Sequence, residues 1–281
     1  MLLGNYLAAL RHGRDESSDR AGAVIGRSAS TISRMEIAAI PLDWTRARTL
    51  LTHYGVPPHR VADVERLLSR PPVECCVDDS QAGWNTRLRA CELQATEIRA
   101  FHSVLVPRPV RTAAYSADLA HQPLADEPLD GHAPLPHPRT GQRRVILLDE
   151  FILDRRSAEP QVMADQLDHL IRLDEAGAIT VRIVPTREVG TLTGSTNLTE
   201  LRYGTLRRQR VMYIQRGPAV SYCLTGCAEG QRAQLDRAEE AALPREESLA
   251  RLAAASTRLA HQAAHADQKN RTRPSLTGTP A

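Results

Sequence analysis

Lysine, aromatic residues and long apolar segments are all scarce in this sequence. Lys269 is the one lysine among 36 basic residues, and aromatic residues make up 4% of the 281 positions. No segment approaches the roughly 18 consecutive apolar residues that cross a membrane, so we expect no membrane contact. The N-terminal segment also lacks a charged leader and a small-residue cleavage site, which predicts a cytoplasmic protein.

The cysteines are too few and too scattered to predict a disulfide framework or a metal site. Their number, five, is odd in a long chain without a secretion signal, which favours free thiols in a reducing cytosol. Adjacent cysteines rarely bind one ion together, and zinc sites use closer ligands, so we predict no metal. Cys91 lies on the apolar stripe of a helix, where a buried thiol is expected. A redox-sensing role is left open for the others, Cys75, Cys76, Cys223 and Cys227.

The positive charge of the chain is concentrated in its first quarter. Residues 1–70 carry ten arginines and seven acidic residues, and the rest of the chain is neutral overall, so the net charge of +3 belongs to this segment. Arginine suits phosphate and guanine because its planar fork forms two parallel hydrogen bonds. We therefore expect a polyanion to bind here, and the salt dependence of that binding to originate in residues 1–70.

Apolar spacing and capping residues predict five short helices over residues 1–70. Ser17 or Ser18 opens the second helix, which stops at Gly26, and Ser28 caps the third. Two short helices joined by a glycine turn form a helix-turn-helix unit, whose second helix enters the major groove of DNA. Serine and threonine hydroxyls suit phosphates or base edges, and arginine suits guanine or phosphate. The residues expected to contact DNA are Arg27, Ser28, Ala29, Ser30, Thr31, Ser33 and Arg34.

The run from Gly26 to Glu36 resembles the recognition half of the Xre family of bacterial regulators. The shared features are the serine cap, the Ser-x-Ser-Thr-Ile-Ser-Arg core and the glutamate that follows. Two positions depart from the family. Ala29 stands where glutamine often contacts adenine, and Ala38 stands where a glycine usually ends the helix. The helix must therefore close without an easy left-handed residue.

Beyond residue 70 the pattern changes to a mixture of helices and strands. We expect a linker at 71–85, a mixed α+β domain at 86–260 and a disordered tail at 261–281. Apolar runs predict strands at 144–150, 179–185, 196–203 and 210–216, and periodic runs predict helices at 160–173 and 228–265. A proline-rich loop is predicted over 122–142, and the histidines of this region, His121, His132 and His137, are expected to be solvated. The fold class is therefore α+β, with an all-α helix-turn-helix domain at the N-terminus.

The second domain resembles, more loosely, the C-terminal part of WhiJ-like antitoxin-like regulators. The matching positions are Trp84, Glu92, Ala95, Ile98, Val106-Pro107, Thr112, Tyr115, Leu148-Asp149-Glu150, Met163, Gln166-Leu167, Val184-Pro185, Tyr213 and the segment from Ala242 to Leu249. Three features depart from the family: the segment from Arg108 to Arg111 replaces the usual Gly-Leu-Leu-Gln, Gln215 replaces an acidic residue, and the loop at 122–142 replaces a stretch that is normally helical and basic. This resemblance implies a cytoplasmic regulator, often paired with a small protein encoded beside it.

The motifs of known enzymes are missing from the second domain. It has no nucleophile elbow, no glycine-rich phosphate loop and no His-Glu-x-x-His, and Asp149-Glu150 at a strand end is expected to be a solvated turn. We therefore predict neither catalysis nor a cofactor. The favoured function is a transcriptional regulator that binds double-stranded DNA as a homodimer, because one recognition helix contacts too few base pairs. The alternative is an antitoxin-like module that sequesters a small neighbour-encoded protein and binds DNA weakly.

Overall fold

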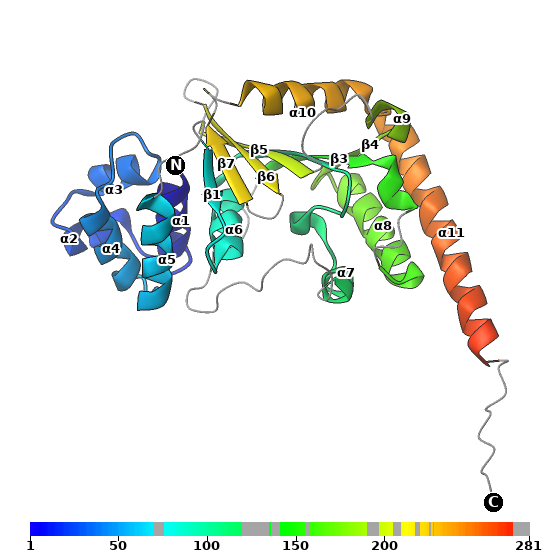
Figure 1. Ribbon diagram of the computed structural model, residues 1–281, viewed down its shortest axis with the longest axis horizontal. Coiled ribbons are helices and arrows are strands. Elements are labelled where there is room, and N and C mark those ends of the chain that lie inside the picture. Colours follow the sequence, from blue (N-terminus) through cyan, green and yellow to red (C-terminus); the bar gives the residue numbers. More distant parts are fainter. Residues whose placement is uncertain are drawn as a thin grey trace, which may run out of the picture. The chain divides into compact units, whose positions relative to one another are not determined.

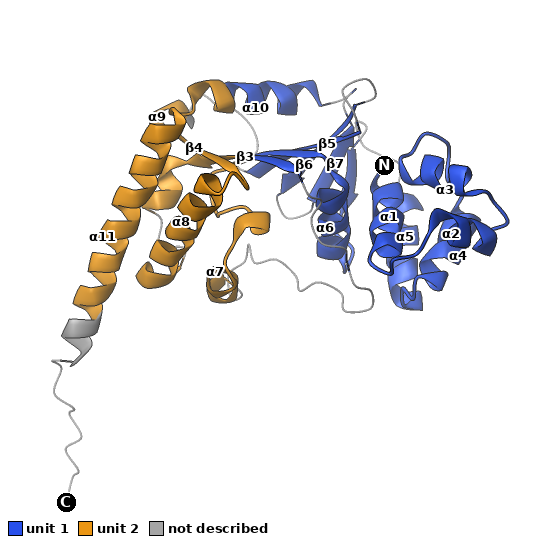
Figure 2. Cartoon of the chain, turned by 180° about the vertical axis from the view of Figure 1, so that it is seen from behind, with its two compact units in different colours: residues 1–100, 126–144, 193–237 blue, residues 101–125, 145–192, 238–281 orange. Residues whose placement is uncertain are grey.

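The chain forms two compact units in the computed structural model. The residues described are 1–69, 76–119, 135, 141–154, 158–189, 197–204, 209–216, 220–224, 226 and 228–271. The first unit combines residues 1–100, 126–144 and 193–237, and the second combines residues 101–125, 145–192 and 238–281 (Figure 2). The domain predicted at 86–260 is thus divided between the two units.

Five helices open the first unit, as the capping pattern predicted (Figure 1). Ser17, Ser28 and Asp43 each accept a hydrogen bond from the backbone N–H three residues on, and so cap the second, third and fourth helices. Apolar residues on the inner faces, such as Leu10, Ile32, Leu51 and Val64, form one buried cluster. The helices are α1 (Leu2–His12), α2 (Ser18–Val24), α3 (Ala29–Glu36), α4 (Trp44–His53) and α5 (Pro58–Ser69).

Helix α1 is buried along nearly its whole length, because it lies between the helical bundle and α6 (Trp84–Gln94). Leu2 of α1 and Leu67 of α5 belong to the same apolar cluster as Leu88, Ile98 and Met212. The helical segment therefore shares a core with the strands of the first unit. The predicted linker is wrong for two parts of 71–85: residues 76–79 form a strand, and α6 has begun by Trp84.

The strands of the first unit follow the order β1-β7-β6-β5-β2, and the pairs β1–β7, β7–β6 and β6–β5 are antiparallel. Three consecutive residues of β6, Met212 to Ile214, are buried, and so are Glu200 and Leu201 of β5, so residues on both faces of these strands are covered. The strands are β1 (Cys76–Asp79), β2 (Glu97–His102), β5 (Asn197–Tyr203), β6 (Arg210–Arg216) and β7 (Val220–Leu224). The predicted strands at 196–203 and 210–216 are confirmed.

Two of the cysteines are bonded, so the prediction of free thiols is wrong for Cys76 and Cys223. The register of β1 and β7 places these two residues directly opposite each other, with their Cα atoms 4.2 Å apart, and their sulfurs form a disulfide. Cys91 is a free, buried thiol, as predicted, and burial raises its pKa to about 12. Cys75 and Cys227 lie outside the described residues.

The second unit contains a parallel strand pair covered by helices. The pair is formed by β3 (Arg143–Asp149) and β4 (Thr180–Val184), and α8 (Pro160–Glu175) connects them. Helices α8 and α11 lie side by side (Figure 1), where Ser256 donates a hydrogen bond to the carbonyl of Ala164 at 3.3 Å. The remaining helices are α7 (Ala113–Asp118), capped by Thr112, α9 (Thr186–Val189), α10 (Glu229–Ala241), which divides between the units, and α11 (Arg245–Arg271).

The elements confirm the predicted fold class, an all-α helix-turn-helix segment followed by a mixed α+β region. The predicted tail is wrong from 261 to 271, because α11 continues to Arg271. The proline-rich loop, with its three histidines, lies outside the described residues except at 135, 141 and 142. In the part of the chain that the structure describes, no helix is both long enough and apolar enough to cross a membrane.

Candidate nucleic-acid interface

A tight turn connects α2 to α3, and two glycines make it possible. Gly26 has φ +63°, a left-handed conformation that glycine adopts without steric cost. The N–H of Arg27 then reaches back to the carbonyl of Gly22 at 2.8 Å. A Cβ atom on Gly22 would lie 2.3 Å from the carbonyl oxygen of Arg27, so only glycine fits there. The two helices and this turn form the predicted helix-turn-helix unit.

The residues predicted to contact DNA all lie at the outer surface of α3 or directly before it. Ile32 and Met35 of the same helix are buried in the bundle, which fixes the opposite face outward. Arg34 extends along the outer face, where its Nε donates to the carbonyl of Ser30 at 3.3 Å. Arg27, Ser28, Ser30, Ser33 and Arg34 are exposed, whereas Ala29 and Thr31 are half-buried.

The hydroxyl groups at the start of α3 are held in place by the helix cap. Ser28 accepts a hydrogen bond from the backbone N–H of Thr31 at 3.3 Å, and the two hydroxyl oxygens lie 3.0 Å apart. A hydroxyl has one donor and two acceptor positions, so both side chains keep capacity for a phosphate or a base. Free backbone N–H groups at the start of a helix also favour an anion.

A buried ion pair fixes α3 against α1. The guanidinium of Arg11 donates from Nε to Glu36 Oε1 at 2.7 Å and from Nη2 to Glu36 Oε2 at 2.8 Å, and both side chains are less than a tenth exposed. The hydrogen bond to Glu36 is the main reason that the pKa of Arg11 is raised, so this arginine stays charged. In the sequence, Glu36 stands out only through the resemblance to the Xre pattern, and nothing there indicates its partner, which lies 25 residues earlier.

Close packing supports the same contact. A Cβ atom on Gly4 of α1 would lie 2.3 Å from the carbonyl oxygen of Glu36, so glycine lets the end of α3 approach α1. No periodic pattern in the sequence distinguishes Gly4 from any other small residue in an apolar helix. The bidentate pair and the close approach together determine where the outer face of α3 points.

The end of α3 closes with alanine where the Xre pattern has glycine. Ala38 has φ +51°, and its N–H donates to the carbonyl of Met35 at 3.0 Å. The N–H of Ala39 donates to the carbonyl of Arg34 at 2.8 Å, which completes the helix end that normally uses a left-handed glycine. Ala38 therefore adopts a left-handed conformation at the end of α3, at a steric cost for a residue with a Cβ atom.

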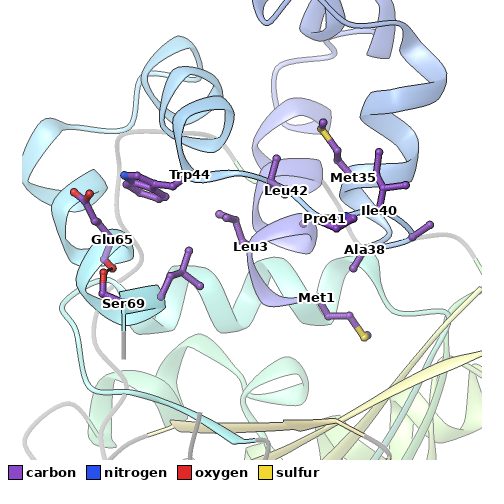
Figure 3. A pocket seen from close by; sticks show the side chains of 13 residues that line it. Met1, Leu3, Met35, Ala38, Ile40, Pro41, Leu42, Trp44, Glu65 and Ser69 are labelled. Carbon is purple, nitrogen blue, oxygen red and sulfur yellow. Dashed lines mark hydrogen bonds between the residues drawn. The ribbon is translucent and has the colours of Figure 1, made fainter. Parts of the chain in front are cut away.

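Two cavities flank the C-terminal end of α3, and they differ in charge. The first, of about 680 Å³, lies among α1, α5 and the segment before α4 (Figure 3). Its wall is mainly apolar, with Leu3, Met35, Pro41 and Trp44, and its one charged residue is Glu65. An acidic, apolar cavity does not attract phosphate. The second cavity, of about 480 Å³, is lined by apolar, polar and charged residues, and its basic side chains are those of Arg11, His12 and Arg210.

The residues considered for acid–base chemistry have structural roles in the second unit. Asp149 was expected in a solvated turn, but it is buried and accepts hydrogen bonds from the N–H of Phe151 at 2.9 Å and the hydroxyl of Thr186 at 3.2 Å. Burial raises the pKa of this carboxyl group. Glu150 forms an ion pair with Arg251. Among the described residues, no group of three or more His, Cys, Asp and Glu side chains could hold a metal ion.

An exposed second helix behind a glycine turn, fixed on a buried bundle, defines a helix-turn-helix protein, a class that binds DNA. A helix-turn-helix domain model matches residues 2–64, and the model of a domain of unknown function (DUF5753) matches residues 86–254. The chain belongs to the DUF5753 family, whose domain covers more than half of it. No curated protein and no solved structure matches the chain.

Proposed function

We propose that this chain is a sequence-specific transcriptional regulator of the Xre type, in which α3 is the helix that enters the major groove. The observation that carries the proposal is the outward face of α3, with Ser30, Ser33 and Arg34 exposed on a helix held by the Arg11–Glu36 pair. A fixed helix of this kind suits specific binding, because base contacts require a rigid support. Such a regulator acts in the cytoplasm, where bacterial DNA is found.

The WhiJ-like part of the proposal concerns the second domain. We propose that it acts by association, as a homodimerisation surface or a binding site for a small neighbour-encoded protein, and not by catalysis. A helix of eight residues contacts few base pairs, which favours two copies on one operator.

Mobility shifts with the full-length chain test DNA binding. Arg34→Ala should weaken binding to a selected operator by roughly 1–3 kcal/mol, and Thr31→Ala should weaken it in the same direction. Arg66→Ala is the matched control, because it removes the same charge from α5, where Arg66 pairs with Asp63. Circular dichroism checks that each variant is folded. Unchanged affinity in both α3 variants would refute this site.

Light scattering tests association. The full chain is measured alone and together with the product of the adjacent gene, because α1 shares a core with α6 and removal of the first five helices would expose that core. We expect a dimer or a stable complex. A chain that stays monomeric on DNA and ignores the neighbouring protein would contradict the proposed role of the second domain.

A further inference from the structure

The second cavity beside α3 joins the recognition helix to the sheet of the first unit. One wall contains Ser33 and Ile37 from the end of α3, and the other contains Tyr203, Gly204 and Arg210 from β5 and β6. Ser33 is exposed, and Ile37 is 52% exposed, so this cavity opens beside the face that is proposed to meet DNA. Arg210 therefore lines the same cavity as Ser33 of α3.

Arg210 provides a positive charge in this cavity, beside His12 and the N-terminal amine of Met1. The guanidinium of Arg11 and the carboxylate of Glu36 also line it, but they neutralise each other in their bidentate pair. Arg210 is half-buried, and no carboxylate among the described residues lies within ion-pairing distance of it. A guanidinium that has no carboxylate partner and lies beside a DNA-binding helix favours the binding of an anion.

The segment that follows α3 offers no cation of its own. Residues 37–43 are Ile-Ala-Ala-Ile-Pro-Leu-Asp, and the cavity on their other side carries only the negative charge of Glu65. A DNA strand that runs past the C-terminal end of α3 would therefore find no basic side chain in residues 37–43. The sheet provides one instead, at the first residue of β6.

We propose that Arg210 binds a phosphate of the DNA that α3 contacts, so that the interface extends from the helix-turn-helix unit onto the β5–β6 side of the first unit. This inference rests on the proposed function of α3. It also revises the expectation that the salt dependence of binding originates only in residues 1–70. A phosphate contact positions the duplex and carries no base preference.

Salt titration measures this contact directly. Each neutralised phosphate contributes about −0.9 to the slope of log K against log salt. Loss of one contact should therefore reduce the slope by about 1, so that a fourfold rise in salt weakens the wild-type chain about threefold more than the variant. Binding to operator and to random duplex should weaken by the same factor.

The experiment uses the full chain, an operator duplex selected from a random pool, and a random duplex of the same length. Arg210→Ala and the longer, uncharged Arg210→Gln should both lower the slope, and Arg210→Lys should keep it. Arg232→Ala is the matched control: it removes the same charge from an exposed site on α10, where Arg232 pairs with Asp236 at 3.6 Å. Melting curves followed by circular dichroism show that each variant is folded.

The outcomes separate this proposal from the function on which it rests. Unchanged slopes in Arg210→Ala and Arg210→Gln, with weaker binding in Arg34→Ala, would overturn the Arg210 contact and leave the helix-turn-helix interface in place. Tighter DNA binding by Arg210→Ala would also overturn the Arg210 contact, because it would show that the arginine side chain hinders the duplex. A wild-type chain that binds neither duplex would remove the proposed function itself.

Discussion

Replacement of Ala38 by glycine should stabilise the first unit. Ala38 has φ +51° at the end of α3, and both backbone hydrogen bonds of that helix end depend on this conformation. An L residue in the left-handed region pays roughly 1–2 kcal/mol, because its Cβ approaches the following carbonyl oxygen. Glycine avoids that cost, but it makes the unfolded chain more flexible, which lowers the free energy of unfolding by about 0.4–1 kcal/mol. The expected net gain is about 0.5–1 kcal/mol.

Chemical and thermal unfolding of the full chain measure this gain. For a cooperative unit of this size, a gain of 1 kcal/mol raises the melting temperature by roughly 2–4 °C. The urea midpoint should rise with an unchanged m-value, because the surface exposed on unfolding is the same. Binding to the selected operator should be unaffected or slightly stronger, since the direction of α3 is preserved.

The neighbouring residue provides a matched control. Ala39 is also exposed but does not have a positive φ, so Ala39→Gly relieves no strain. It should lower the free energy of unfolding by about 0.4–1 kcal/mol, because glycine makes the unfolded chain more flexible. The two substitutions remove the same methyl group and should change stability in opposite directions. If Ala38→Gly destabilises the chain as much as Ala39→Gly does, the assignment of backbone strain to the end of α3 is wrong.

Two further perturbations test the contacts that hold the first unit together. Glu36→Gln leaves Arg11 charged, buried and without its carboxylate, so the free energy of unfolding should fall by about 3 kcal/mol. Glu247→Gln, in an exposed pair, should lower the free energy of unfolding by less than about 1 kcal/mol. Equal urea midpoints for the two variants would contradict this difference. A reducing agent should lower the unfolding free energy of the wild-type chain by about 2–4 kcal/mol and leave Cys223→Ser unchanged. A wild-type midpoint that does not respond to the reductant would argue against the disulfide.

Local signals in the sequence determined the helices and the candidate interface. Ser17, Ser28 and Gly26 each act within one turn of a helix, so their effect is visible in a few neighbouring residues. Ile32 and Met35 are three residues apart and therefore lie on one face of α3, which predicts the outer face from the sequence alone. The strands of the second half are predicted in the same way by short apolar runs.

Only the tertiary structure decided which distant residues meet. The segment around Cys76 is too polar and proline-rich to predict a strand, yet it pairs with β7 and bonds to Cys223, 147 residues away. The partner of Glu36 is Arg11, and the cavity beside the end of α3 is also lined by Arg210 of β6. Such contacts depend on chain closure over long separations and on the packing of whole elements, and neither leaves a repeating pattern along the sequence.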